Sequence, residues 1–189
     1  ARSTPIHVRL TGSSSLSPAR NAASGRREAA RRFRYRVDDM LRSVLILVHL
    51  SGVIAWVGGM FFAYFCLRPA AAQLLDPPQR LPLWAATLKR FFRVAAFAVT
   101  LVLVSGLTML AQTGFQSAPL GWHLMAGLGL TMAGVFAFAY GIVYPGLRSH
   151  CEAAAWPMAA ASLNSIRQLV GVNLLLALCT LAIAVFSRS

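Results

Sequence analysis

Hydrophobic residues are concentrated in four long blocks, and most charged residues lie between or before them. The blocks run over about 43–67, 90–112, 121–145 and 164–187. Each is close to the roughly 20 residues that a helix needs to cross about 30 Å of hydrocarbon. Because every backbone amide inside a bilayer needs an internal partner, apolar blocks of this length predict helices rather than barrel strands. The sequence therefore predicts an all-α fold, a four-helix transmembrane bundle in the lipid bilayer.

Residues 1–39 have a different composition from the rest of the chain. They hold nine arginines and three acidic residues, with many Ala, Ser and Gly and no apolar run. Such a segment cannot bury enough apolar surface to offset the entropy lost on ordering. We therefore expect a disordered, Arg-rich extension at 1–39 and a four-helix domain at 40–189. The extension has no aromatic residues between its arginines beyond Phe33 and Tyr35 and no nucleic-acid-binding fold, so we expect it to bind anionic lipid headgroups and no nucleic acid.

The overall composition agrees with a membrane protein and limits the chemistry. Apolar residues make up 57% of the chain, charged residues make up 12%, and the mean hydropathy is +0.62. These values exclude an ordinary soluble globule. Cys66, Cys151 and Cys179 show no CxxC spacing, which argues against a zinc site or a disulfide framework. After the extension the carboxylates are Asp76 and Glu152, both in connections, so no acid–base pair for hydrolysis is expected.

The basic residues between the blocks predict an orientation. We call side A the side that holds the start of the first block, the 113–120 connection and the C-terminus, and side B the opposite side. If translation starts at Met40, side B carries seven Lys and Arg and side A carries two. Counting the extension reverses this balance, but the short 113–120 connection has no charge, and short loops report orientation best. We therefore expect the connections at 67–90 and 146–164 to be cytoplasmic.

Two histidines lie inside apolar blocks, on helices that run in the same direction. At 100° per residue His49 shares a face with Trp56, while His123 begins a row of glycines in the third helix. Small residues at such spacing let helices approach closely, so we expect them to form interior packing seams. The expected packing residues are Gly52 and Gly59 in the first helix, Gly127, Gly134 and Gly141 in the third, and Asn173 in the fourth.

His49 and His123 are expected to lie in the side A leaflet, about 6 Å apart in depth. Ionisable residues within membrane spans are candidates for function, although an interhelical hydrogen bond used for packing is the alternative. With Met109, which adds a sulfur at similar depth, the two imidazoles would suit cuprous copper. Two facing imidazoles could also hold haem b axially, with Trp56 as a further cofactor contact. The spacing alone does not choose between copper and haem.

Several short strings give the chain a resemblance to a known family. They are the first-helix string His49-Leu50-Ser51-Gly52-Val53-Ile54-Ala55-Trp56-Val57-Gly58-Gly59-Met60, and then Leu67-Arg68-Pro69-Ala70, Arg90-Phe91-Phe92, His123 to Gly129, Tyr144-Pro145 and Ile166 to Val170 with Asn173. Over residues 41–187 the sequence resembles the copper resistance protein D (CopD) family of bacterial inner-membrane proteins. The resemblance implies copper handling, such as binding or import at the periplasmic face, with His49 and His123 as metal contacts. Larger members have eight helices, which implies a homodimer if this chain transports copper.

Two further functions remain open at this stage. The pattern of His49, Trp56 and Gly59 is also similar to HemJ-type protoporphyrinogen oxidases, which are small haem-containing membrane enzymes. Those enzymes carry a basic residue two positions after the third-helix histidine, where this chain has Met125. The other alternative is a cofactor-free accessory subunit whose small-residue seams bind a larger membrane complex.

Overall fold

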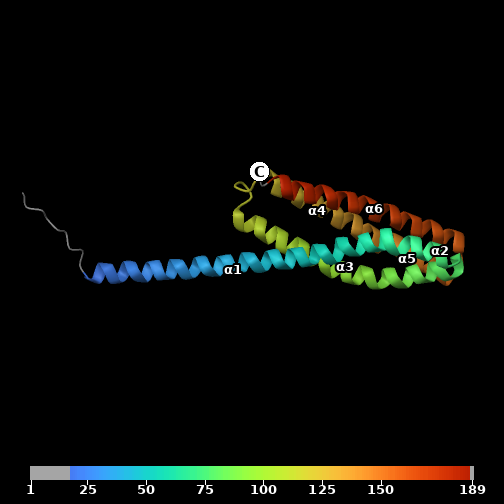
Figure 1. The fold of residues 1–189 in the computed structure, drawn as a ribbon, viewed down its shortest axis with the longest axis horizontal. Coiled ribbons are helices and arrows are strands. Elements are labelled where there is room, and N and C mark those ends of the chain that lie inside the picture. The colour runs from blue at the N-terminus through green and yellow to red at the C-terminus, as the bar shows by residue number, and fades with distance from the viewer. Residues whose placement is uncertain (1–17, 188–189) are drawn as a thin grey trace, which may run out of the picture. The chain divides into compact units, whose positions relative to one another are not determined.

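The fold was analysed in a computed structural model, which describes residues 18–187, with side chains from Gly25 onward. The chain divides into two compact units, residues 1–41 and 42–189. The helical elements of the described part are α1 (Pro18–Phe62), η1 (Ala63–Leu67), α2 (Arg68–Leu74), α3 (Pro77–Thr113), α4 (Leu120–Phe138), η2 (Ala139–Val143), α5 (Tyr144–Glu152) and α6 (Trp156–Phe186). The elements η1 and η2 are single turns of π-helix, and the whole sequence of elements is shown in Figure 1.

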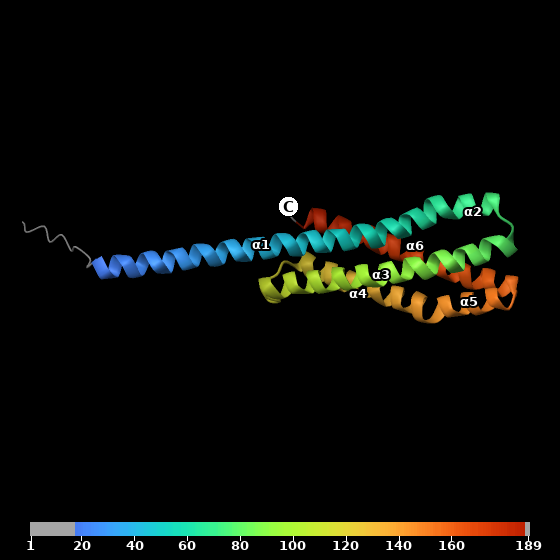
Figure 2. The same ribbon diagram turned by 90° about the horizontal axis from the view of Figure 1, so that it is seen from below.

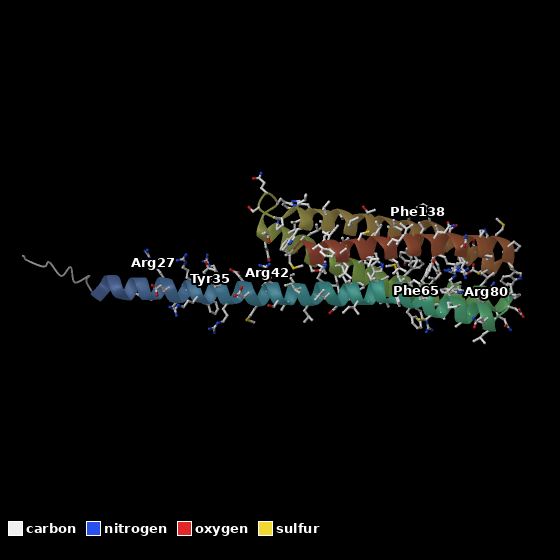
Figure 3. The ribbon with its side chains drawn as sticks, turned by 45° about the horizontal axis from the view of Figure 1, so that its top comes forward. Arg27, Tyr35, Arg42, Phe65, Arg80 and Phe138 are labelled. Atoms are coloured by element: carbon white, nitrogen blue, oxygen red, sulfur yellow. The ribbon has the colours of Figure 1, made fainter. Side chains whose placement is uncertain are left out.

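The four expected membrane helices are confirmed. Four helical stretches are long and apolar enough to cross a bilayer: Gly25–Leu74, Pro77–Thr113, Leu120–Glu152 and Trp156–Phe186. Large apolar side chains such as Phe65 and Phe138, both labelled in Figure 3, remain more than 45% exposed. Because lipid tails solvate such side chains, this exposure suits a bundle within a membrane. The protein is therefore an all-α membrane bundle.

The helices extend further than the hydrophobic blocks predict. The expected connection at 67–90 shrinks to residues 75–76, and the one at 146–164 shrinks to 153–155. The reason lies partly in the prolines, because Pro77 and Pro78 begin α3, where a missing N–H costs nothing. Pro69 is the second residue after the π-helical turn η1, and this wider turn accommodates the proline, so the chain stays helical as far as Leu74.

The expected disorder of the extension differs from the structure at residues 18–39. These residues are helical as the first part of α1, and every described side chain from Gly25 to Leu41 is exposed. Burial therefore contributes little to this helix. Its composition explains it, because Ala and Arg are among the strongest helix formers. The expectation for residues 1–17 lies outside the described residues.

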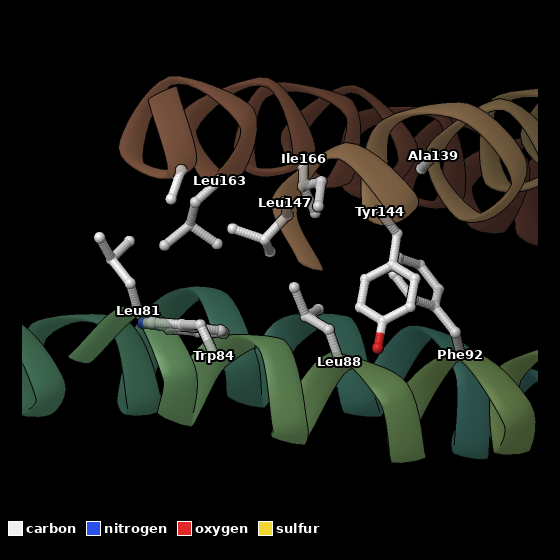
Figure 4. Packing of buried hydrophobic residues seen from close by; sticks show 10 residues of the cluster. Leu81, Trp84, Leu88, Phe92, Ala139, Tyr144, Leu147, Leu163 and Ile166 are labelled. Carbon is white, nitrogen blue, oxygen red and sulfur yellow. The ribbon is translucent and has the colours of Figure 1, made fainter. Parts of the chain in front are cut away.

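The core of residues 42–189 is built from two clusters of side chains. The first lies near side B, where Leu81, Trp84 and Leu88 of α3 point toward Leu147, Leu163 and Ile166 (Figure 4). The second lies nearer the middle of the spans and holds Trp56, Met60, Ala95, Ala98, Val99 and Met132. Helix α4 packs along α6, and α5 packs against both α6 and α3 (Figures 1 and 2). These contacts fix the helices that carry the candidate residues.

Candidate functional site

His49 of α1 is held against α3 by its ring nitrogen Nδ1. This atom lies 3.0 Å from the carbonyl oxygen of Val102 and 3.1 Å from Ser105 Oγ. A carbonyl oxygen can only accept a hydrogen bond, so Nδ1 carries the proton and donates it. The hydroxyl of Ser105 donates to the Leu101 carbonyl, which leaves its oxygen free to accept from His49 as well. In the neutral ring, Nε2 is therefore the nitrogen with a lone pair for a ligand.

Glycines create the space in which this ring lies. A Cβ added to Gly106 would come within 3.1 Å of His49 Cε1. A Cβ added to Gly52 would lie 2.8 Å from Val102 Cγ2 and 3.0 Å from the Ala98 carbonyl oxygen. Because any larger residue would push the two helices apart, Gly52 sets the close approach of α1 to α3. Gly59 has the same role against the ring of Phe91, so both glycines expected to pack in the first helix do so.

Trp56, expected on the face of His49, lies in the core of the bundle. Its side chain is 2% exposed and meets the ring of Phe136 edge-on at 6.1 Å. A cavity of about 10 Å³, roughly the size of one water molecule, is lined by Trp56 and Asn173 among others. Asn173 donates from Nδ2 to the Met132 carbonyl at 3.2 Å, which ties α6 to α4. Trp56 Nε1 and Asn173 Oδ1 have no protein partner among the described residues.

His123 lies in a different environment from His49. Its ring is exposed, and its Nδ1 lies 3.3 Å from the carbonyl oxygen of Pro119, at the start of its own helix. The Nδ1 of His49 instead contacts Val102 and Ser105 of α3. Each histidine thus has its own hydrogen-bond partners, and a shared two-histidine site stays a prediction.

The glycine row of the third helix does not lie on the inner face where the sequence predicts it. Gly127, Gly134 and Gly141 are exposed, and a Cβ at any of them would meet nothing within 4 Å. The expected interior seam therefore lies on the exposed face, while Met132 and Ala139 face the core instead. Almost every residue of this helix is apolar or small, so its sequence carries no polar face from which the inner side could be read. Helix α4 packs against α6 through a different face.

Met109 lies on α3, four residues after Ser105, and is half-buried. Residues four apart share a helix face, so its sulfur is placed one turn from the serine that holds His49. Within the described part of the chain, no three His, Cys, Asp or Glu side chains gather as a metal site.

Ser105 is the residue of this site that the sequence reasoning did not connect to His49. It is 1% exposed, which makes it one of the two fully buried polar residues in the described core. The sequence does contain a sign of this contact, because Ser105 and Gly106 stand in an otherwise apolar helix at the depth of His49. Only the relative rotation of the two helices, which sequence does not give, brings them together.

Comparison with known proteins supports one family. The family model described as copper resistance protein D matches residues 85–187, which is more than half of the chain and covers most of α3 and all of α4, α5 and α6. No curated protein matches the sequence significantly, and no solved structure matches the fold. The matched part contains Ser105, Gly106, Met109 and His123, whereas His49 precedes it. The chain thus belongs to the copper resistance protein D (CopD) family, and it is a multi-pass membrane protein related to copper resistance.

Proposed function

We propose that this chain binds copper as its substrate at side A of the membrane, and that His49 is the residue that contacts the metal. The observation that carries the proposal is the pair of acceptors around His49 Nδ1, at 3.0 and 3.1 Å. Histidines that bind metals usually donate their second ring N–H to a carbonyl or a similar acceptor, which fixes the ring and its tautomer. The imidazole of His49 has this arrangement inside an apolar span.

Copper in its cuprous form is the metal that the neighbouring residues favour. Cuprous copper accepts few ligands and prefers soft donors such as thioether sulfur together with imidazole nitrogen. Met109 supplies such a sulfur one turn from Ser105, and the apolar surroundings offer few hard oxygen ligands. Haem b would need two axial imidazoles that face each other, and the exposed ring of His123 gives no support to that alternative. Copper therefore remains the proposed substrate.

The proposed orientation follows from the charges at the two ends. Side B carries Arg68, Arg80 and Arg167 with further basic residues, so we place it in the cytoplasm of a bacterial inner membrane. His49 would then lie toward the periplasm, where copper enters. Transport across the whole membrane would need a path beyond His49, which a homodimer or a larger membrane complex could supply.

Copper binding by His49 variants tests the proposal. Purified protein in detergent competes with a chromophoric chelator for cuprous copper under reducing conditions. We expect His49→Ala to weaken copper binding by more than about 100-fold, beyond the 10- to 100-fold loss typical of residues that only support a ligand. His49→Ala that binds copper as tightly as the unchanged protein would refute the assignment.

His150→Ala is the matched control. The Nδ1 of His150 lies 3.2 Å from Ser162 Oγ, so this histidine also contacts a serine, but on α5 near side B. We expect its replacement to leave copper binding unchanged. Equal losses in the two variants would point to adventitious binding by any histidine rather than to a site at His49.

A further inference from the structure

Three arginines gather at side B of residues 42–189. They come from different elements: Arg68 begins α2, Arg80 lies in the first turn of α3, and Arg167 lies on α6. The charges of Arg68 and Arg80 both act on Arg167, so each of these two guanidinium groups lies within electrostatic reach of Arg167. Figure 3 shows Arg80 at this end of the bundle. Three like charges repel each other unless an anion lies between them.

Aromatic rings hold two of these guanidinium groups in place. The guanidinium carbon of Arg68 lies 5.3 Å from the centre of the Tyr64 ring, and that of Arg167 lies 5.9 Å from the centre of the Trp84 ring. Such cation–π contacts fix the position of a guanidinium without using its N–H donors. The donors of Arg68 and Arg167 therefore remain available to a ligand.

The cluster contains buried donors that no protein atom satisfies. The Nε atoms of Arg80 and Arg167 and the Nε1 atom of Trp84 are buried without a hydrogen-bond partner among the described residues. The ion pair found within residues 25–187, Arg148 with Glu152, involves none of them. Burying an unpaired donor is unfavourable, and more so when the donor is charged. An acceptor at this place would remove that cost for several donors at once.

This arrangement differs from that of ordinary basic residues at a membrane surface. Lys89, Arg90 and Arg93 of α3 are exposed, as expected of side chains that extend their charges toward headgroups and water. Arg68, Arg80 and Arg167 are half-buried instead. Their stems can follow the apolar surface as in snorkelling, but the buried Nε atoms of Arg80 and Arg167 still lack an acceptor among the described residues.

A cavity lies next to the cluster and has room for part of an anion. Its volume is about 30 Å³, and its lining includes Arg68, Arg167, Trp84 and Tyr64 among apolar side chains. One water-sized group occupies about 10–15 Å³, so the cavity can receive about two oxygen atoms. The Nε and Nη donors of a guanidinium form a planar fork that binds two oxygens of a phosphate or carboxylate side by side.

We propose that Arg68, Arg167 and Trp84, which line the cavity, form a binding site for the phosphate group of an anionic ligand at side B, with Arg80 as a further positive charge nearby. A phosphate group suits the site because its several oxygens can accept hydrogen bonds from donors that approach from different elements. The ligand is either the headgroup of an anionic phospholipid or free inorganic phosphate, which present the same chemistry. Arg68 lies 19 residues after His49, about 28 Å along a helix, so the phosphate site is separate from the proposed copper site.

Thermal unfolding of the detergent-purified full chain tests the site with two ligands. One series adds inorganic phosphate at constant ionic strength, with chloride as the balancing anion, and the other adds short-chain phosphatidylglycerol against phosphatidylcholine. We expect at least one ligand to raise the unfolding midpoint in a saturable way. Stabilisation by phosphate identifies a site open to the free anion, whereas stabilisation by phosphatidylglycerol alone identifies a lipid site.

Variants then locate the binding. Arg167→Gln should weaken the apparent affinity about tenfold or more, since it removes a charged hydrogen-bond partner. Trp84→Phe keeps an aromatic ring and removes the N–H donor of the indole, so it should weaken binding several-fold even if Arg167→Gln does not fold. Arg90→Gln changes an exposed arginine on the same helix as Trp84 and should leave the affinity unchanged.

Either of two results would overturn the proposal. The first is the absence of saturable stabilisation of the unchanged protein by both ligands. The second is an equal loss of affinity in Arg90→Gln and Trp84→Phe, which would indicate general surface attraction. Copper binding is unaffected by these outcomes, so the two proposals can fail independently.

Discussion

Replacing Ser105 with alanine removes one of the two acceptors around His49 and leaves the other in place. The hydroxyl oxygen of Ser105 lies 3.1 Å from His49 Nδ1, while the Val102 carbonyl remains at 3.0 Å. Ser105 is 1% exposed, so no bulk water replaces the lost oxygen. The ring therefore keeps its tautomer but loses part of what fixes its orientation.

The expected loss of copper affinity in Ser105→Ala can be estimated from this geometry. Residues that orient a metal ligand typically contribute 10- to 100-fold to metal affinity. Because Val102 still accepts the Nδ1 proton, we expect the lower value, about tenfold, or about 1.4 kcal/mol of binding free energy. The effect on folding should be smaller, since hydrogen bonds between membrane helices average about 0.6 kcal/mol.

Two measurements on the same detergent-purified Ser105→Ala variant separate these effects. Chelator competition gives the affinity for cuprous copper, and unfolding by a denaturing detergent gives the free energy of unfolding. Thr100→Ala is the control, because Thr100 is exposed on the same helix and its hydroxyl donates to the Ala96 carbonyl of its own helix. We expect this control to change neither quantity by a measurable amount.

One result would refute the reasoning about His49. If Ser105→Ala binds copper as tightly as the unchanged protein while His49→Ala loses binding, the serine does not orient the ligand. A loss of stability much larger than the loss of copper affinity would assign Ser105 to packing alone.

Two further predictions concern the packing of the helices. Gly52→Ala should lower the free energy of unfolding by about 1–3 kcal/mol, because the new Cβ would meet Val102 at 2.8 Å and the Ala98 backbone at 3.0 Å. Asn173→Ala should lower it by about 0.6–1.7 kcal/mol, since it removes the hydrogen bond to the Met132 carbonyl across α4 and α6. Both are measured by unfolding in mixed detergent micelles.

Each packing prediction has a matched control. A Cβ added to Gly58 would meet nothing within 4 Å, so Gly58→Ala should not destabilise the protein. Thr131→Ala removes an exposed hydroxyl that bonds to the Gly127 carbonyl of its own helix, and it should have little effect. The interpretation of Gly52 fails if both glycine variants behave alike. The interpretation of Asn173 fails if Asn173→Ala lowers the free energy of unfolding by no more than Thr131→Ala does.

The sequence predicted the membrane bundle because helix length and apolar content are properties of each segment by itself. Four apolar blocks require four helices whatever their neighbours are. Helix ends were harder to predict, since Pro69 and Pro77 stand outside the apolar blocks but lie in the first turn of helices, where proline is accepted. The helix at 18–39 was missed because burial was given more weight than the high propensity of Ala and Arg.

The candidate site was only partly predictable, because it depends on how each helix rotates about its axis. The first helix carries the polar His49 and the aromatic Trp56 on one face, and that face points inward. The third helix offers only small and apolar residues, and its glycine row was placed on the wrong side. Where no side chain distinguishes one face from another, contacts with neighbouring helices decide which face is buried.

The two π-helical turns alter the direction in which the side chains after them point. In each, an N–H bonds to a carbonyl five residues back, from Arg68 to Ala63 and from Tyr144 to Ala139. One surplus residue per turn shifts the angular phase of everything that follows by about 100° relative to a regular helix. Side chains beyond η1, Arg68 among them, therefore point about 100° away from the direction that an uninterrupted α1 would give them. A face drawn through His49 and Trp56 cannot be extended to these residues by counting along the sequence.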